Sequence, residues 1–189
     1  MGILRTIGLY VKYLQARLKY HGRVHFNGFT VVYCFSGSSI NFMGGGIRIN
    51  SSPLSNLVGL SQRSILVARY GGRIDIGENT GISGSTIYSM QHIEIGKNVL
   101  IGGNCKIIDN DFHPLRVEKR IPFQRNEDIN KRPIKIGDGC FIGANSIILK
   151  GTVLGKNCVV GAGSVVSGKF PDNVIIAGNP AKVIRTNNK

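Results

Sequence analysis

Aliphatic residues recur at every sixth position through the later part of the chain. A small residue stands two positions before the aliphatic residue in five of the six repeats, and glycine directly follows the aliphatic residue in four of them. The aliphatic positions are Ile136, Ile142, Ile148, Leu154, Val160 and Val166. A period of six matches neither an amphipathic helix, which repeats every 3.6 residues or so, nor an alternating strand, which repeats about every two. It is typical of a coil with three flat faces and one hexapeptide to each face.

This repeat predicts an all-β column with three sides. We expect the aliphatic residues to face inward, the small residues to fit beside them near the corners, and glycine to relieve strain where the chain turns. Successive coils would then pair as parallel strands about 4.8 Å apart. A β-sandwich is the alternative, and it is disfavoured because sandwich turns fall at irregular spacings of about 8–12 residues.

An earlier block carries the same repeat, and a degenerate form of it extends toward the N-terminus. The frame of the earlier block slips by one residue between Tyr88 and His92. The block consists of Ile76, Ile82, Ile95, Ile101 and Ile107. The degenerate part contains three aliphatic–x–apolar triplets, Val24-His25-Phe26, Ile40-Asn41-Phe42 and Ile47-Arg48-Ile49. These triplets predict imperfect early coils, followed by a loop around Ser51–Gly59.

We divide the chain into four parts on this basis. A basic amphipathic helix is expected at 1–20, degenerate coils at 21–73, regular coils at 74–185 and a tail at 186–189. From Phe170 onward we expect the chain to fold back as a cap on the column.

A charged loop at 109–132 interrupts the regular coils. Nine of its residues from Arg116 onward carry a charge, and Pro114 and Pro122 keep it out of a regular strand ladder. An excursion of this length inside a tightly periodic structure is unusual, and such loops are commonly functional.

The first 20 residues predict a helix with one apolar stripe. Its residues are Ile3, Ile7, Val11, Leu14 and Leu18. We expect the stripe to dock on the open end of the column, because the end of a repeat structure needs a cap. The alternative is that it rests on an anionic membrane.

No targeting segment is evident in the sequence. The chain has no run of 18 or more apolar residues, as a transmembrane helix would need, and basic residues interrupt the first 20 positions with no small-residue cleavage site after them. We expect a cytoplasmic protein, with peripheral contact at the inner face of the plasma membrane as the alternative for residues 1–20.

The net charge of +14 favours anionic partners. The candidates are coenzyme A phosphates, nucleotide-sugar diphosphates, acidic glycans and membrane phospholipid. Nucleic acid is disfavoured, because the basic residues are spread along the chain without a recognition helix, and the aromatic residues form no stacking platform.

The four cysteines contain no CxxC pair, which disfavours a zinc knuckle or a thioredoxin-like motif. Cys140 and Cys158 are 18 residues apart, one full turn of a three-sided coil, so they should stack. A disulfide is geometrically possible there, but free thiols acting as small hydrophobic residues are favoured in a reducing compartment.

The sequence segment Asp109-Asn110-Asp111-Phe112-His113-Pro114 is the candidate site. Counting sixes from Ile95 places His113 in a slot that should hold a core aliphatic residue, and local inconsistencies of this kind tend to mark functional sites. A neutral imidazole can take a proton from a hydroxyl near pH 7. Asp109 or Asp111 would hold the other ring nitrogen, or simply cap a turn.

Residues 134–185 resemble the hexapeptide-repeat acyltransferases, and the likeness extends over 72–185. The motif Asp-x-Asp-Phe-His-Pro and the ending Ala177-Gly178-Asn179-Pro180-Ala181-Lys182 carry it. The resemblance is to the branch of sugar and polysaccharide O-acetyltransferases that is related to the maltose and galactoside enzymes. It implies a left-handed parallel β-helix, a homotrimer, acetyl-CoA as co-substrate and a sugar or glycan acceptor.

The resemblance also implies roles for individual residues. His113 is expected as the general base, and the backbone N–H of Ala144 on a neighbouring subunit as the donor to the thioester oxygen. Ala162 and Ser167 would line the pantetheine groove, and Lys182 and Arg185 would meet the CoA phosphates. Acceptor contacts are expected from Ser83, Ser85 and Phe141, the last at a position where sugar acetyltransferases often carry tryptophan.

Three other functions compete with sugar O-acetylation. A γ-class carbonic anhydrase needs three zinc-binding histidines, two of them close in sequence, whereas His92 and His113 are 21 residues apart, so we predict no metal. A non-enzymatic scaffold is disfavoured by His113, its charged loop and the preserved ending. N-acetylation of a nucleotide-linked amino sugar stays open, although the Asp-Phe-His-Pro motif favours the O-acetyl branch.

Overall fold

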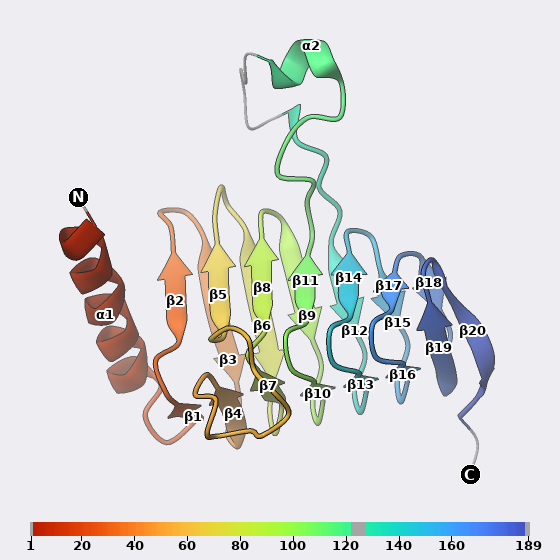
Figure 1. Cartoon of the computed structure of the whole chain (residues 1–189), viewed down its shortest axis with the longest axis horizontal. Coiled ribbons are helices and arrows are strands. Elements are labelled where there is room, and N and C mark those ends of the chain that lie inside the picture. The colour runs from red at the N-terminus through yellow and green to blue at the C-terminus, as the bar shows by residue number, and fades with distance from the viewer. Residues whose placement is uncertain (1, 122–127, 188–189) are drawn as a thin grey trace.

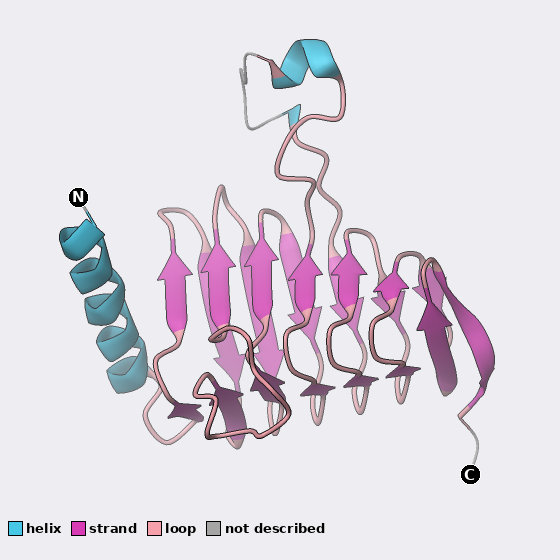
Figure 2. Cartoon of the chain, in the orientation of Figure 1, coloured by secondary structure: helices cyan, strands magenta, loops and turns pink. Residues whose placement is uncertain are grey.

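The computed structural model describes residues 2–121 and 128–187, with side chains from residue 6 onward. The chain forms a three-sided column, with helix α1 (Gly2–Lys19) at its N-terminal end and an arm that carries α2 (Val117–Arg120) projecting from its middle (Figure 1). Almost all of the remaining structure is short strands joined by turns (Figure 2).

The strands of the described ranges form three sheets, one for each side of the column. The first sheet contains β1 (Val24–Asn27), β4 (Ile47–Asn50), β7 (Gly81–Ser83), β10 (Leu100–Ile101), β13 (Phe141–Ile142), β16 (Val159–Val160), β19 (Val174–Gly178) and β20 (Ala181–Thr186). The second contains β2 (Val31–Cys34), β5 (Ile65–Ala68), β8 (Thr86–Ser89), β11 (Lys106–Ile108), β14 (Ile147–Leu149) and β17 (Val165–Val166). The third contains β3 (Ser39–Met43), β6 (Arg73–Gly77), β9 (His92–Ile95), β12 (Ile134–Ile136), β15 (Val153–Leu154) and β18 (Lys169–Phe170).

Each coil visits the three sheets in the same order, so residues of equal phase stack from coil to coil. Ile101 pairs with Ile142, and Ile142 with Val160, in parallel register along the first sheet. We name the turns by the strands they join: the first corner leads from the first sheet to the second, the second corner from the second to the third, and the third corner back to the first. The pattern is that of a left-handed β-helix, as predicted.

The predicted inward column forms the core of the protein. All six aliphatic residues of the regular repeat are at most 1% exposed. The small residues two positions earlier are buried as well, which confirms their placement beside the column. Burial of branched aliphatic side chains on three sides of one axis is the main stabilising contribution available to so narrow a structure.

Glycine is required in this repeat for a reason different from the predicted one. A Cβ on Gly77 would lie 2.5 Å from the backbone of Gly96, and a Cβ on Gly137 would lie 2.6 Å from that of Gly155. The close approach of successive coils therefore excludes a side chain. The left-handed turn conformation falls instead on neighbouring residues such as Asn98, with φ of 56°.

The early coils are more complete than the sequence indicates. The three predicted triplets lie in β1, β3 and β4, but the strands of the second sheet, β2 and β5, escaped prediction. The loop expected around Ser51–Gly59 runs from 51 to 64, between β4 and β5. It lies against the first corner, where Asn104 binds Ser61 and Gly59.

Helix α1 docks on the end of the column as expected, but with a different face. Tyr13 and Ala16 are buried, and the Tyr13 ring packs edge-on against Phe26 at 5.9 Å. The hydroxyl of Tyr20 donates to the Ile40 carbonyl at 2.8 Å. Tyrosine suits this position because it covers the apolar end while its hydroxyl satisfies an open backbone carbonyl.

The predicted apolar stripe of α1 is therefore wrong as a docking face. Ile7, Val11, Leu14 and Leu18 are 40–79% exposed, while the side chain of Ile3 lies outside the described residues. Within the described ranges, neither helix has the length and apolar character needed to cross a membrane.

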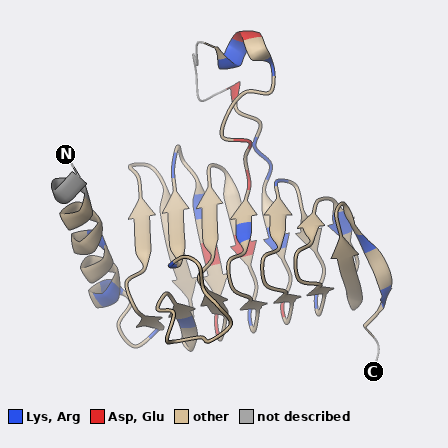
Figure 3. Ribbon diagram, viewed as in Figure 1, with Lys and Arg blue, Asp and Glu red and all other residues tan. Residues whose placement is uncertain are grey.

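The C-terminal segment folds back later than predicted. β19 continues the first sheet in parallel with β16, and only β20 turns back, pairing antiparallel with β19. Basic residues are visible on β20 and near the C-terminal end of α1, at opposite ends of the column (Figure 3). The last two residues of the predicted tail lie outside the described ranges.

The cysteines are free, in agreement with the favoured interpretation. The Cys140 thiol donates to the Gly155 carbonyl at 3.1 Å, and the Cys158 thiol donates to the Pro171 carbonyl at 3.1 Å. Burial raises the pKa of the Cys140 thiol to about 12. These thiols act as small core residues that satisfy corner carbonyls.

Candidate functional site

The arm leaves the column at the second corner, directly after β11. Its base is a short two-stranded stalk. The Asp111 N–H donates to the Asn130 carbonyl at 3.0 Å, and the Arg132 N–H donates to the Asp109 carbonyl at 2.9 Å. Between these contacts, Asn110 forms an antiparallel bridge with Lys131. Pro122 of the loop prediction, and two of the charged residues counted there, Arg125 and Glu127, lie outside the described residues.

His113 follows this stalk through a tight turn. Phe112 has φ of 59°, its N–H donates to the Asn110 side chain at 2.9 Å, and the His113 N–H donates to the Asp111 carbonyl at 2.7 Å. The Phe112 ring packs against Tyr88 on the outer face of the second sheet, with centroids 4.9 Å apart.

His113 does not occupy a core slot. Its side chain is exposed and stands on the arm, because the chain has already left the column after Ile108. The counting argument is therefore wrong about a core slot for His113. The interruption of the repeat marks the start of the arm, and His113 stands at that start.

Asp109 is a structural residue of the second corner. Its carboxylate is fully buried and accepts four hydrogen bonds, which occupy both oxygens. The donors are the Ser89 hydroxyl at 2.7 Å, the Met90 N–H at 2.8 Å, the Gln91 N–H at 2.9 Å and the Asn110 amide at 3.1 Å. Asp109 therefore holds together the turn that contains the predicted frame slip.

Asp111 is placed differently. One of its carboxylate oxygens lies 2.5 Å from the Lys150 ammonium, while the other is buried and has no hydrogen-bond partner among the described residues. A buried carboxylate oxygen without a donor is costly, and such atoms call for an explanation. Of the two aspartates, Asp111 alone has acceptor capacity left beside His113.

A second set of predicted residues gathers along the first corner. A Cβ on Gly143 would meet the backbone N of Ala162 at 2.5 Å, which places the turns of Ala144 and Ala162 in direct contact. The next coil adds Ala177, whose partner on β20 is Lys182. Ala144, Ala162 and Lys182 thus form one line along the C-terminal half of the column.

The remaining predicted cofactor residues lie apart from that line. Ser167 is exposed in the second corner, after β17. Arg185 pairs with Ile175, toward the other end of β19 from Lys182. Within one chain, the width of the second sheet separates Ala144 from Ser167 and from the arm with His113.

The three predicted acceptor residues have unequal access. Phe141 is 47% exposed on the outer face of the first sheet, next to Leu100. Ser83 is 6% exposed, and its hydroxyl accepts from the Asn50 and Asn56 amides at 3.2 and 3.0 Å.

Ser85 lies inside the wall of the column, with no exposed surface. Its hydroxyl donates to the Ser83 and Gly102 carbonyls and accepts from the Cys105 N–H, each at 2.9 Å. A substrate would have to break these bonds to reach it. The expectation that Ser85 contacts an acceptor is therefore wrong, since this hydroxyl is needed by the turn.

Two features lie at the candidate site that the sequence did not assign to it. Lys150 anchors Asp111, and its only sequence signal is a charge at a corner of the most regular segment. The loop at 51–64 covers the first corner near Gly84 and Gly103, where added Cβ atoms would meet Leu60 at 2.9 and 3.0 Å. Among the described residues, no three His, Cys, Asp or Glu side chains are grouped so as to hold a metal ion.

Comparison with known proteins agrees with this geometry. The model of the hexapeptide repeat of succinyl-transferase matches residues 92–108 and 133–167. The galactoside O-acetyltransferase of Escherichia coli is 38% identical over 117 residues, which cover 61% of this chain and 55% of that protein. A candidate lipopolysaccharide biosynthesis O-acetyl transferase of the same organism is 34% identical over 108 residues, 54% of each chain.

Solved structures are similar over most of the chain. A galactoside acetyltransferase in complex with coenzyme A aligns with a TM-score of 0.55 and 25% identity, covering 94% of this chain and 72% of that one. The chain spans about half the length of the curated relatives it matches. The shared repeat, the three-sided column and these similarities make the chain similar to the hexapeptide-repeat acetyltransferases.

Proposed function

We propose that this protein transfers an acetyl group from acetyl-CoA to a sugar hydroxyl in the biosynthesis of a bacterial surface polysaccharide such as capsule, O-antigen or exopolysaccharide. The observation that carries the proposal is the turn in which the His113 N–H donates to the Asp111 carbonyl, together with the second Asp111 carboxylate oxygen, which is buried and has no hydrogen-bond partner among the described residues. The similarity to galactoside and lipopolysaccharide acetyltransferases supports the acceptor class and the pathway class.

In this proposal His113 is the general base. A sugar hydroxyl is a poor nucleophile at neutral pH, so its proton must leave as the oxygen attacks the thioester carbon. Asp111 would position the ring and stabilise the imidazolium that forms, because it has an oxygen to offer and Asp109 has none. The proton then passes to the departing CoA thiolate, and no acyl-enzyme is needed.

The oxyanion that forms during attack needs a donor, and we assign it to the Ala144 N–H. A backbone donor of this kind typically contributes about 10²–10³ in rate. The line from Ala144 through Ala162 to Lys182 offers a path for the pantetheine arm toward a cationic end for the CoA phosphates, to which Arg185 would add.

The proposed site requires a second copy of the chain. Five residues, three of them in β14, separate Ala144 from the second corner. At about 3.3 Å for each extended residue this is roughly 16 Å, too far for one copy to supply both donor and base. A neighbouring copy that brings its arm and Ser167 beside the Ala144 line would complete the site. We therefore propose a homotrimer.

The outer faces of the sheets support this arrangement. The second sheet carries an outward apolar row whose members pair strand to strand, namely Tyr33, Val67, Tyr88, Ile108 and Leu149. The outer face of the third sheet is charged instead, with Asp75 bound to Arg73 and His92. An apolar sheet face of this extent is typical of a subunit interface.

We also propose that the protein works in the cytoplasm with α1 against an anionic membrane. The apolar residues that α1 leaves exposed lie on the same helix as Lys12, Arg17 and Lys19. A helix with an apolar face and flanking cations binds at the interface of anionic bilayers.

An acceptor screen tests the function. The purified protein is incubated with acetyl-CoA and a panel of neutral and acidic mono- and oligosaccharides, and free thiol is measured. We expect acceptor-dependent thiol release and a product whose acetyl group is removed by hydroxylamine, as an ester is. An amide product that resists hydroxylamine would identify N-acetylation instead, and no acceptor-dependent release would argue against acetyl transfer.

A further inference from the structure

The end of the column beside α1 carries a cavity lined by basic side chains. Its volume is about 700 Å³, within the usual range for small-molecule sites. The basic residues lining it are Arg17, His21, Arg23, His25 and Arg48, and none of the described residues that line it is Asp or Glu. They come from α1, the turn after it, β1 and β4, so the cavity is formed where the helix meets the first sheet.

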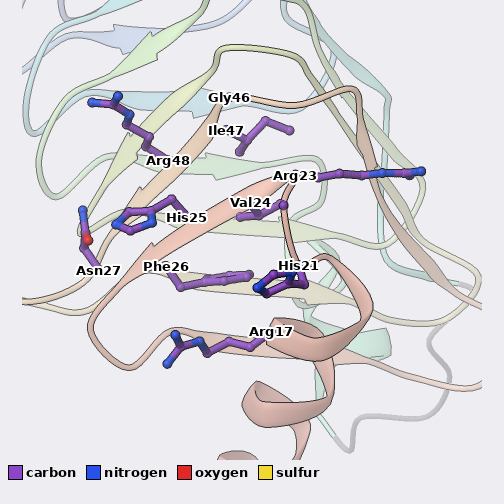
Figure 4. Close-up of a pocket in the computed structure, with 11 residues that line it drawn as sticks. Arg17, His21, Arg23, Val24, His25, Phe26, Asn27, Gly46, Ile47 and Arg48 are labelled. Carbon is purple, nitrogen blue, oxygen red and sulfur yellow. The ribbon is translucent and has the colours of Figure 1, made fainter.

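Two of these residues are held together by the strand register. His25 of β1 lies directly opposite Arg48 of β4, and both are exposed on the outer face of the sheet. Basic residues in directly opposed positions disfavour strand pairing when both are charged. In Figure 4 the side chains of Arg17, His25 and Arg48 extend toward the left of the view, while Arg23 extends to the right.

The cations of this cavity lack counter-charges. No ion pair in the described part of the chain includes Arg17, Arg23 or Arg48. On the third sheet, by contrast, Arg73 binds Asp75 at 2.6 Å. A cation in the last turn of a helix commonly complements the helix dipole, which accounts for Arg17. It does not account for His25 and Arg48, which project from strands.

We infer that this cavity binds the phosphate groups of a phosphorylated ligand. Guanidinium groups match phosphate oxygens in paired hydrogen bonds, and two of them from different elements can clasp one anion from two sides. The volume accommodates a diphosphate with part of the group it is attached to.

The position of the cavity indicates which part of a substrate it would hold. Arg48 pairs with Gly81, Gly81 with Leu100, and Leu100 with Phe141, so the cavity and the proposed acceptor residue Phe141 lie on the same outer face. Three strand spacings of about 4.8 Å separate Arg48 from Phe141, roughly 14 Å.

An acceptor sugar near Phe141 with its phosphate at Arg48 fits this distance. This assignment of the ligand as the acceptor rests on the proposed function, whereas phosphate binding itself does not. A sugar linked to a nucleoside diphosphate and a sugar linked to a lipid diphosphate share the required chemistry.

Calorimetric titration with inorganic pyrophosphate tests the inference on the full-length protein. The titration is run with saturating CoA, which fills the proposed phosphate contacts on β20. We expect saturable binding that weakens at least tenfold in Arg48→Gln and in Arg17→Gln. Arg73→Gln is the matched control, because it removes the same charge from a guanidinium group on the third sheet that is bound to Asp75 and lies outside the cavity, and it should change the affinity less than twofold.

Vesicles distinguish the two sources of phosphate. If Arg48→Gln also weakens association with phosphatidylglycerol vesicles, the cavity holds a lipid phosphate; if association is unchanged, it holds a soluble phosphorylated ligand. Absence of pyrophosphate binding, or equal losses in all three variants, would overturn the inference. CoA binding by the same protein is measured in parallel. If CoA binds and pyrophosphate does not, the phosphate site in the cavity is excluded, while the proposed acetyl transfer from acetyl-CoA is unaffected.

Discussion

The Lys150 ammonium lies 2.5 Å from a carboxylate oxygen of Asp111 and thereby ties a corner of the regular column to the base of the arm. The two residues are 39 positions apart in the chain. Because His113 follows Asp111 by two residues through a hydrogen-bonded turn, this contact helps set where the histidine stands. The position of the proposed base therefore depends in part on a long-range contact.

Replacement of His113 tests the proposed chemistry most directly. We expect His113→Ala to lower turnover by about 10²–10⁴, the usual contribution of a general base. Acetyl-CoA binding, measured by calorimetry, should be retained, because the histidine is exposed on the arm and is not part of the core. A variant with normal turnover would show that the base lies elsewhere.

Variants of the two aspartates should have different effects: the Asp111 variant on the rate of the reaction, and the Asp109 variant on the stability of the fold. Asp111→Asn is expected to lower kcat by roughly 10-fold to 100-fold, as is found for residues that orient functional histidines, with the KM for acetyl-CoA unchanged. Asp109→Asn should instead lower the free energy of unfolding by about 1–3 kcal/mol, because its new amide hydrogens face four donors.

Urea unfolding and steady-state kinetics on both variants check this pair. Asp138→Asn is the stability control. Asp138 also accepts a backbone hydrogen bond at a corner, from Lys97, but its side chain is 47% exposed, so the loss should be smaller. Equal kinetic losses in the Asp109 and Asp111 variants would remove the distinction between them.

The basic residues of β20 are expected to bind the CoA phosphates. Replacing Lys182 and Arg185 by Ala should raise the KM for acetyl-CoA, and the effect should shrink as salt is added, because exposed charge interactions are screened. A double variant at Lys135 and Lys156, on the third sheet and the third corner, removes the same charge as a control. An unchanged KM at low salt would contradict the assignment of Lys182 and Arg185.

The outer face of α1 should govern association with anionic vesicles. Deleting the whole helix would uncover the aromatic end of the column, so surface variants are the sharper test. Val11→Ser with Leu18→Ser should reduce vesicle sedimentation without lowering the melting temperature, because both residues are exposed. Gln15→Ser, also exposed on α1, should leave sedimentation unchanged. Undiminished sedimentation of the double variant would exclude this face as the anchor.

The cysteines should differ widely in reactivity. Cys34 is exposed, whereas burial raises the pKa of the Cys140 thiol to about 12, so almost none of it is thiolate at pH 8. Because the thiolate is the reactive form, a thiol reagent should label one cysteine rapidly in the native protein and all four after unfolding. Cys34→Ser should abolish the rapid phase. Rapid labelling of several thiols in that variant would contradict the buried placement.

The repeat by itself determined the column. A six-residue period leaves each inward position with the same neighbours in every coil, so local sequence predicts both the fold and the core residues from Ile136 to Val166. The same logic located the arm, because the place where the period stops is visible in the sequence. The resemblance of one short motif then singled out His113.

The tertiary structure decided which polar side chains still have a hydrogen-bonding atom available and which already use all of theirs within the fold. Asp109 and Asp111 look alike in the sequence, yet one is enclosed by four donors of the preceding corner and the other faces Lys150 from a later coil. The stripe of α1 was likewise open to two uses until the end of the column selected Tyr13 and Tyr20, whose hydroxyls meet its backbone carbonyls. These outcomes depend on contacts between segments that are distant in the sequence. The pattern of hydrophobic residues does not predict which hydrogen-bonding groups such contacts bring together.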